Sequence, residues 1–336
     1  MRKNDTIFFE QPPIITHWAA IGGKKESEGP LAAAFDQTFE DNSLGAESWE
    51  QAEQELQHQC LSEMLKKADL TEDQLDLLLG GDLQNQCTAT AYAAGKVDVP
   101  FAGLYNACAT MAEGLVIGSC LTAGGFVNRA AVIASSHFCA AERQFRTPLN
   151  YGGKRTPTSQ WTATASGCCL LSREGSGVRI AAATFGRIRD LAVSDVNNMG
   201  AAMAPAAAET ILRYLADSGY GPEEFDAIFT GDLGLVGSRL LKDLCEKEGR
   251  PIPNHQDCGM MIFDLQNQEV QAGASGAGCS AAVLCTHILP ALRSGKYRKV
   301  LFLSTGALMS QISVLQGQTI PGVAHLVELW GKGVTE

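Results

Sequence analysis

Residues 104–114 read LYNACATMAEG, and the rest of the chain is organised around this stretch. An apolar run at 99–104 predicts a strand, whereas small and apolar residues from Ala107 onward predict a buried helix. Cys108 is therefore expected at a strand-to-helix turn, in the first turn of the helix. Unpaired N–H groups and the positive end of the helix dipole favour a thiolate at such a position. The alternative is a small buried thiol, since free cysteine is among the most buried residue types.

Length and composition indicate a closely packed α/β protein. The chain has 336 residues, of which 45% are hydrophobic and 19% charged, and 35 are glycine. This composition excludes a disordered chain, and the length gives room for two core-bearing units. The formal net charge is −11 and no basic run occurs, so binding of nucleic acid through a charged face is not expected.

Eleven cysteines raise the question of disulfides or a metal site. Most lie in apolar runs such as residues 168–171, their number is odd, and no CxxC pair or Cys/His cluster has metal-ligand spacing. We therefore expect reduced thiols in a cytosolic protein, with no metal and no cofactor. Asp5 and Glu10 interrupt any N-terminal apolar segment, and no apolar run reaches about eighteen residues, so neither a signal peptide nor a membrane span is expected.

The second half of the chain repeats the pattern of the first. The apolar strand that ends in Asp82 has a counterpart that ends in Asp232, and residues 127–136 have a counterpart at 297–305. A duplication of this length is too long for a solenoid. It predicts two α/β halves related by a pseudo-twofold axis, as in an internally duplicated domain pair.

The predicted halves are residues 1–174, which carry the Cys108 elbow, and residues 175–336. The two acidic residues at equivalent strand ends, Asp82 and Asp232, suggest either paired carboxylates for acid–base chemistry or caps of the helices that follow. Their symmetric placement favours the capping role.

A duplicated α/β chain with a cysteine elbow resembles the thiolase superfamily, which includes the condensing enzymes of fatty-acid synthesis. Residues 106–109, Asn-Ala-Cys-Ala, look like their nucleophile turn, and residues 273–278, Gly-Ala-Ser-Gly-Ala-Gly, look like the glycine-rich turn of their second half. This resemblance implies a thiolase-like fold in a layered αβαβα arrangement, with Cys108 at the nucleophile position.

A closer resemblance rests on five more distinctive stretches. They are HW at 17–18, GGDLQNQ at 80–86, SSHFCAAERQFR at 135–146, RTPTSQWT at 155–162 and LSTGALMS at 303–310. Together they are similar to the stage V sporulation protein AD family of spore-forming bacteria, over essentially the whole chain. That resemblance implies a thiolase-like protein without known turnover, with a role in sporulation and germination.

The same resemblance implies a ligand, partners and a location. The ligand is dipicolinic acid (pyridine-2,6-dicarboxylate), with or without calcium. The partners are integral membrane proteins of the same sporulation apparatus, which move calcium dipicolinate into the developing spore. The implied location is peripheral, on the cytoplasmic side of the forespore or spore inner membrane.

The second half lacks the groups that would activate Cys108. Condensing enzymes carry His-Gln-Ala-Asn where residues 231–234 read Gly-Asp-Leu-Gly, and thiolases carry Gly-His-Pro where residues 269–271 read Glu-Val-Gln. A histidine, alone or with an asparagine, is needed to activate such a thiol and to stabilise the oxyanion. We therefore interpret Cys108 as a vestigial nucleophile in a non-catalytic binding protein. The alternatives are a 3-oxoacyl-ACP synthase III-like condensing enzyme (an acyltransferase) that uses Cys108, and a purely structural scaffold for membrane partners.

A cationic segment supplies the candidate ligand contacts. Arg143, Arg146 and Arg155 lie within residues 140–160 of an otherwise acidic protein, and Trp161 follows directly. Arginine is the side chain best suited to planar carboxylates, because it donates two parallel hydrogen bonds. We expect these arginines to hold the two carboxylates of the ligand; the alternative is a solvated loop.

His137 and the Cys108 elbow complete the predicted binding site. His137 ends a predicted strand and is expected to donate to the second carboxylate, while the helix N-terminus at Cys108 adds N–H donors for an anion. The alternative for His137 is a hydrogen-bonded loop histidine with no ligand.

The strand before the elbow also predicts the oligomeric state. Residues 99–104 carry no charge, and as a bare sheet edge they would invite aggregation. In the resembled fold this strand pairs with its twin in a second copy, so we expect a homodimer.

Overall fold

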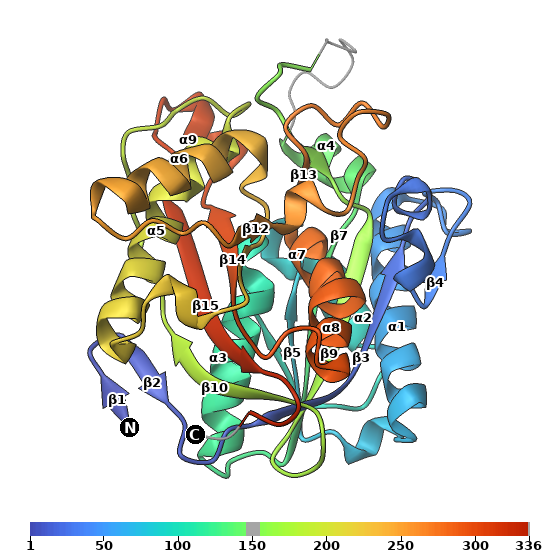
Figure 1. The fold of residues 1–336 in the computed structure, drawn as a ribbon. Coiled ribbons are helices and arrows are strands. Elements are labelled where there is room, and N and C mark those ends of the chain that lie inside the picture. The colour runs from blue at the N-terminus through green and yellow to red at the C-terminus, as the bar shows by residue number, and fades with distance from the viewer. Residues whose placement is uncertain (146–154, 335–336) are drawn as a thin grey trace.

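The computed structural model describes residues 1–145 and 155–334, and most of its strands form one long mixed sheet (Figure 1). The strand order is β12-β11-β14-β15-β10-β3-β9-β7-β5-β6. In the first half these strands are β3 Ile14–Gly22, β5 Leu77–Gly81, β6 Phe101–Gly103, β7 Arg129–Ser136 and β9 Ala165–Ser172. In the second half they are β10 Val178–Thr184, β11 Ala227–Thr230, β12 His255–Asp257, β14 Lys299–Ala307 and β15 Gly322–Trp330. The short strands are β1 Arg2–Lys3, β2 Thr6–Phe8, β4 Gln37–Thr38, β8 Trp161–Thr162 and β13 Ala274–Ser275.

The two halves have the same strand order. The first runs β3-β9-β7-β5-β6 and the second runs β10-β15-β14-β11-β12. In each, the last three strands are mutually parallel and the first two pair antiparallel. Strand β10 pairs with both β15 and β3, which joins the halves. The sequence-based boundary after residue 174 lies in the turn between β9 and β10.

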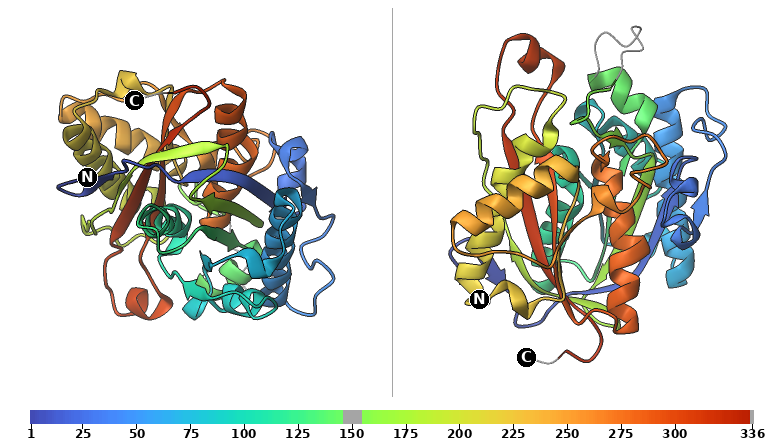
Figure 2. Two further views of the ribbon diagram at one scale, coloured as in Figure 1. Left: turned by 90° about the horizontal axis from the view of Figure 1, so that it is seen from below. Right: turned by 45° about the horizontal axis from the view of Figure 1, so that its top comes forward.

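Helices cover the sheet from both sides and also fill the space between its two halves (Figure 1). Their bounds are α1 Trp49–Ala68, α2 Thr88–Ala94, α3 Thr110–Ala123, α4 Phe138–Phe145, α5 Met199–Ser218, α6 Gly234–Lys247, α7 Ala277–Val283, α8 Leu289–Ser294 and α9 Gln311–Leu315. Figure 2 shows α3 enclosed between the strands of the two halves. None of the helices within the described ranges is both long and apolar enough to cross a lipid bilayer.

Strands in both halves are buried on both faces, which explains their continuous apolar runs. On β9, Cys168 and Leu170 pack toward α1, whereas Cys169 and Leu171 pack toward the central helices. The layers therefore run α1, first-half strands, α3 with α7, second-half strands, and α5 with α6. This order gives the predicted αβαβα arrangement.

The amphipathic helix predicted at 49–67 is confirmed as α1. Ser48 caps it, because its Oγ accepts a hydrogen bond from the Gln51 backbone N–H at 3.3 Å. Leu56, Cys60 and Met64 recur at helical spacing and are fully buried against the sheet. Local sequence alone thus specifies this outer layer.

A buried ring of hydrogen bonds lies between α1, α2 and the ends of β5 and β7. It runs Glu53–Gln84–Asp82–Thr90–Gln57–Ser135 and returns to Glu53, with donor–acceptor distances of 2.6–2.9 Å. Asp82 also accepts from the Thr90 N–H in the first turn of α2, which confirms its predicted capping role. Burial and, second, the nearby Asp82 carboxylate raise the pKa of Glu53 to about 8.

Glu53 is expected to make stability depend on pH. Its pKa rises from an ordinary 4.5 to about 8 in the fold, so between these values the folded protein holds a proton that the unfolded chain releases. The free energy of unfolding should therefore fall as pH rises from about 5 to about 8. Glu53→Gln should make this slope shallower in urea unfolding measured across the range, and the remaining slope should come from other buried carboxyls such as Glu26 and Asp257, whose pKa values rise to about 7. Glu63→Gln, on the same helix but partly exposed, should keep the parent slope; equal slopes for parent and Glu53→Gln would contradict the argument.

Candidate functional site

The strand-to-helix elbow predicted around Cys108 is confirmed. The strand is shorter than expected: β6 spans only Phe101–Gly103, because Pro100 has no N–H for the ladder and β5 beside it is short. After Asn106 the chain makes a 3₁₀ turn, Ala107–Ala109, that leads into α3. Ala107 has a φ of +49°, a strained value for a residue with a side chain. Packing around the elbow must therefore hold this backbone in place.

The second half supplies that packing at Gly306 on β14. A Cβ at this position would lie 2.8 Å from the Asn106 carbonyl oxygen and 3.1 Å from the Ala109 Cβ. Only glycine lets β14 approach the elbow so closely. The glycine in the LSTGALMS stretch thus has a steric role in joining the halves.

The Cys108 thiol faces a buried carboxylate from the second half. Asp232, which follows β11, accepts hydrogen bonds from the Cys108 thiol, from the Gly276 N–H at 2.9 Å and from Thr305 Oγ1 at 2.8 Å. We call Cys108, Asp232, Gly276 and Thr305 the elbow site. Its members come from the elbow, the end of β11, the start of α7 and β14, so tertiary structure alone brings them together.

The capping role predicted for Asp232 is wrong. The helix that follows Asp232 is α6, and its first N–H groups, those of Leu233 and Gly234, donate to Asp257 at 2.9 Å each. Asp257, at the end of β12, therefore caps α6. Asp232 instead accepts hydrogen bonds within the elbow site. The pseudo-symmetric positions of Asp82 and Asp232 therefore have different roles.

The electrostatics of the elbow site oppose a reactive thiol. Burial raises the pKa of Cys108 well above its usual value, and the Asp232 carboxylate raises it further. Burial raises the pKa of Asp232 to about 6, so at neutral pH most of it is a carboxylate. A nucleophilic cysteine needs a nearby base or positive charge. Cys108 has an anion instead and is held as a neutral thiol.

The buried histidines nearest this region are bound to other groups. His325 Nε2 lies 2.8 Å from the side-chain amide of Asn106, and the Gly186 N–H donates to His325 Nδ1. Burial lowers the pKa of His325 to about 4, so the ring is neutral. His325 therefore holds the elbow in place through Asn106. His255 is 2.8 Å from Thr230 Oγ1.

The structure does not bring His137 to the elbow site. Its Nε2 lies 2.7 Å from the Asn42 carbonyl oxygen, its Nδ1 is 3.4 Å from the Ala140 N–H, and its ring stacks on Trp49. The side chain is fully buried, and burial lowers its pKa. The neutral ring therefore uses both nitrogens in holding the start of α4 and the 42–49 segment.

The three candidate arginines have different surroundings. Arg143 is exposed on α4 and forms an ion pair with Glu50 of α1 through two of its nitrogens. Arg146 lies outside the described residues. Arg155 is mostly buried, pairs with Glu142 at 2.6 Å and donates to the Gln160 carbonyl oxygen at 3.0 Å. Arg143 therefore links α4 to α1, whereas Arg155 links Glu142 to the backbone at Gln160.

Arg155 and Trp161 belong to one cluster of cations and rings. Phe138 and Trp161 stack with their centroids 4.0 Å apart and their planes at 7°. The Arg155 guanidinium carbon lies 4.7 Å from the Trp161 centroid, and Lys25 Nζ lies 4.5 Å from it. We call Lys25, Phe138, Arg155 and Trp161 the cation–aromatic cluster. Sequence reasoning missed Lys25 and Phe138, because nothing local connects them with Trp161.

Gln160 connects the cation–aromatic cluster with the elbow site. Its side-chain amide donates to the Asp232 and Ala274 carbonyl oxygens, both at 2.7 Å. The next residue, Trp161, pairs with Ala274 in the small parallel ladder of β8 and β13. The predicted glycine-rich turn at 273–278 therefore lies between the two groups of residues and contacts both.

The surface also has two grooves that lie apart from the residues described above. Two grooves, of about 390 and about 460 Å³, lie beside the N-terminal arm and between α5 and α6. Neither is lined by the elbow site or the cation–aromatic cluster. Within residues 1–145 and 155–334, no three His, Cys, Asp or Glu side chains are grouped to hold a metal ion.

Comparisons with known proteins agree with this geometry. The family model described as Stage V sporulation protein AD matches residues 3–330. The stage V sporulation protein AD of Bacillus subtilis (strain 168) is 41% identical over 321 residues, which cover 95% of each chain. The crystal structure of 3-oxoacyl-[acyl-carrier-protein] synthase III from Aquifex aeolicus VF5 is 13% identical, with a TM-score of 0.57 over 95% of this chain and 99% of that one. A crystal structure of a variant of Xanthomonas campestris OleA is 14% identical and reaches a TM-score of 0.63 over 96% of this chain and 100% of that one. The predicted thiolase-like fold is confirmed.

We expect the Cys108 thiol to react slowly with alkylating reagents. The Asp232 carboxylate is one cause of this slow reaction, and mutation can remove it. Asp232→Asn takes away a negative charge beside the sulfur, so the Cys108 pKa should fall. Alkylation by iodoacetamide at pH 7.5 should become roughly threefold faster for each pKa unit lost, because the thiolate fraction rises while each thiolate becomes less nucleophilic. Peptide mapping separates Cys108 from the other partly exposed thiols, Cys120 and Cys139. Asp82→Asn, at the equivalent strand end, should leave the Cys108 rate unchanged. An unchanged rate in Asp232→Asn would refute the electrostatic account.

Proposed function

Because this chain belongs to the stage V sporulation protein AD family, and so acts in sporulation, we propose that it binds dipicolinic acid without converting it. The ligand is a planar aromatic ring with a carboxylate on each side of the ring nitrogen. The observation that carries the proposal is the cation–aromatic cluster, in which Arg155 and Lys25 both lie within 5 Å of the Trp161 ring centroid. The cluster thus places two cations, one for each carboxylate, beside aromatic rings that an aromatic ligand can contact.

The charges around Arg155 define how the ligand would be held. The Arg155 side chain is 12% exposed and pairs with Glu142, so an incoming carboxylate has to share the guanidinium with that residue. Lys25 is half-buried and forms no ion pair within the described residues. We expect Lys25 to take one carboxylate as a mobile point charge and Arg155 to orient the other through its rigid fork.

The elbow site is the reason that we propose ligand binding without catalysis. Acyl transfer at Cys108 would need a thiolate and a donor for the oxyanion. Asp232 keeps the sulfur protonated and would repel a developing oxyanion. We therefore interpret the thiolase-like fold as a scaffold whose nucleophile position is vestigial.

The proposed setting follows from the family. We propose that the protein works at the cytoplasmic side of the forespore inner membrane with integral membrane partners of the same apparatus. In this arrangement the chain supplies ligand recognition and its partners supply the path across the membrane. Calcium would accompany the ligand through the carboxylates and ring nitrogen of dipicolinate.

Isothermal titration calorimetry tests the ligand. Parent protein should bind dipicolinate, and Arg155→Lys should weaken binding about tenfold because the bidentate fork is lost while the charge paired with Glu142 is kept. Lys25→Gln should weaken binding by a similar factor. Arg143→Ala and Arg298→Ala remove exposed cations elsewhere and should stay within about twofold of the parent.

Benzoate, with one carboxylate, is the matched ligand control and should bind far more weakly. Equal affinity for benzoate, or parent-like affinity in both cluster variants, would contradict the proposed site. Absence of dipicolinate binding by the parent would favour a purely structural scaffold. An acyl-thioester on Cys108 after incubation with acetyl-CoA would instead favour a condensing enzyme.

We also propose that the protein is a homodimer formed through the edge of the sheet. In the described residues β6 ends the strand order at this edge, with β5 on its one paired side. Phe101 on the strand and Tyr105 just after it are exposed apolar side chains. A second copy paired at this edge would satisfy the backbone groups of β6 and cover both rings.

Sedimentation velocity at micromolar concentration should therefore show a dimer. Phe101→Glu places a charge on the edge strand and should yield monomer. Phe126→Glu changes an exposed ring away from β6 and should leave the dimer intact. A monomeric parent protein would refute this proposal.

A further inference from the structure

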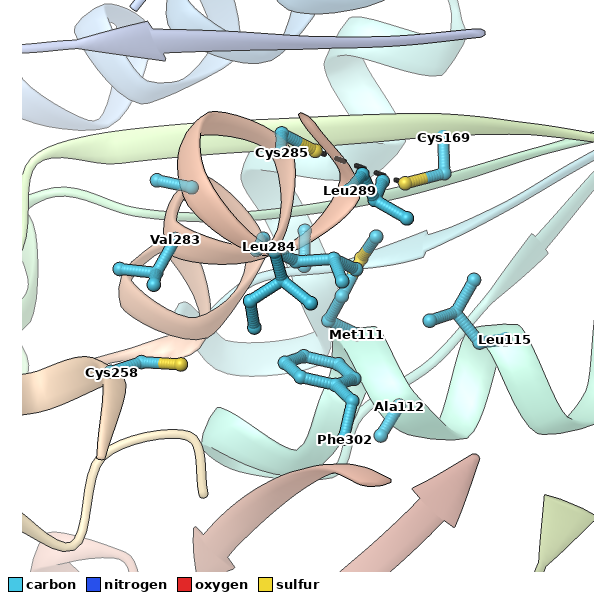
Figure 3. Close-up of a cluster of buried hydrophobic side chains, with 14 of the residues drawn as sticks. Met111, Ala112, Leu115, Cys169, Cys258, Val283, Leu284, Cys285, Leu289 and Phe302 are labelled. Carbon is cyan, nitrogen blue, oxygen red and sulfur yellow. Dashed lines mark hydrogen bonds between the residues drawn. The ribbon is translucent and has the colours of Figure 1, made fainter. Parts of the chain in front are cut away.

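Two buried thiols from opposite halves of the chain face each other in the core. Cys169 Sγ on β9 lies 3.8 Å from Cys285 Sγ on the π-helical segment Leu284–Ile288, 116 positions later (Figure 3). All eleven cysteines of the chain are free thiols. We propose that Cys169 and Cys285 form a redox modification site, at which a peroxide produces a disulfide that joins the two halves.

The backbone around the pair brings the two sulfurs within 3.8 Å of each other. Cys169 is held in the middle of the sheet, opposite Trp18 of β3 and Val132 of β7. Cys285 lies on a π-helical turn, an irregular element that occurs mostly as a single turn within helices and frequently at functional sites. The sulfurs already touch, and a disulfide needs them at about 2.05 Å. Forming the bond therefore requires rotation of both side chains and an adjustment of the π-helical turn.

The chemistry balances with one peroxide per pair. One thiol, as its thiolate, attacks the peroxide oxygen, which breaks the O–O bond and leaves a sulfenic acid and one water. The second sulfur then attacks the sulfenic sulfur, the S–S bond forms and a second water leaves. The pair loses two protons and two electrons, and the peroxide is reduced to two waters. Cys285 is 3% exposed and Cys169 is not exposed at all, so we assign the first attack to Cys285.

Burial slows both the oxidation of the two thiols and the reduction of the disulfide. Burial raises the pKa of Cys169 well above its usual value, so thiolate is scarce and oxidation must follow local opening of the core. The same burial hides the finished bond from reducing thiols. The pair is therefore suited to a slow and lasting cross-link, which accumulates while a protein persists, rather than to a rapid sensor.

The cross-link would act on the central layer of the fold. The π-helical segment continues α7, and α7 begins directly after Gly276, whose N–H holds Asp232 in the elbow site. A bond from Cys285 to β9 therefore ties the helix of the second half to the sheet of the first. The halves lose the freedom to separate, and the unfolded chain is constrained by a long closed loop.

Peptide mapping of the whole protein under non-reducing conditions tests the proposal. After removal of reductant, the protein is held with hydrogen peroxide a few degrees below its melting temperature, where local opening is frequent. The expected product is a linked pair of peptides that contain Cys169 and Cys285, with the mass of two hydrogens lost. The oxidised protein should melt about 2–5 °C higher, and a reductant applied to unfolded protein should abolish the shift.

Variants separate this pair from the other core thiols. Cys285→Ala should lose both the linked peptides and the melting shift. Cys168→Ala, adjacent to Cys169 but packed on the α1 face of the sheet, should keep both. Absence of the Cys169–Cys285 peptide in the oxidised parent, or a parent-like melting shift in oxidised Cys285→Ala, would overturn the proposal. The parent peptide map needs no variant and gives the answer even where a core substitution fails to fold.

Discussion

The fold depends on a central layer of helices that both halves of the chain must share. Helix α3 belongs to the first half and α7 to the second, and each is buried between the two sets of strands (Figure 2). Strands on either side of such a layer are covered on both faces, so most of their residues are apolar. Close approach also requires small residues, which explains the glycine at position 306 against the elbow and the abundance of glycine in the chain.

The same constraint decides the chemistry at Cys108. The elbow projects its thiol into the contact between the halves, beside the fully buried Asp232 carboxylate, whose charge acts strongly on it. Asp232 occupies this space and carries a negative charge that three donors stabilise. The elbow site thus presents a neutral thiol beside an anion. The charges at the elbow site therefore oppose nucleophilic attack by this thiol.

Two groups of buried polar side chains in this protein are extensively hydrogen-bonded. The ring through Glu53 and Asp82 connects six residues of the first half, and Asp257 in the second half accepts from Leu233, Gly234 and Thr230. Such groups are costly to bury unless their partners are in place. The cation–aromatic cluster differs, because Lys25 and the Trp161 ring keep part of their surface exposed. That difference is why the cluster, and not the carboxylate ring, is the candidate for an external ligand.

Sequence alone determined the features that depend on local pattern. Helix α1 with its Ser48 cap, the elbow at Cys108 and the duplicated strand pattern follow from periodicity and short motifs, and the family follows from distinctive stretches. Tertiary structure alone decided which side chains meet. Asp232 reaches Cys108 rather than its own helix, Arg143 pairs with Glu50 while Arg155 stacks on Trp161, and Cys169 meets Cys285. These contacts join residues far apart in the chain, and their energies come from burial and charge in the folded core, which no local pattern of residues records.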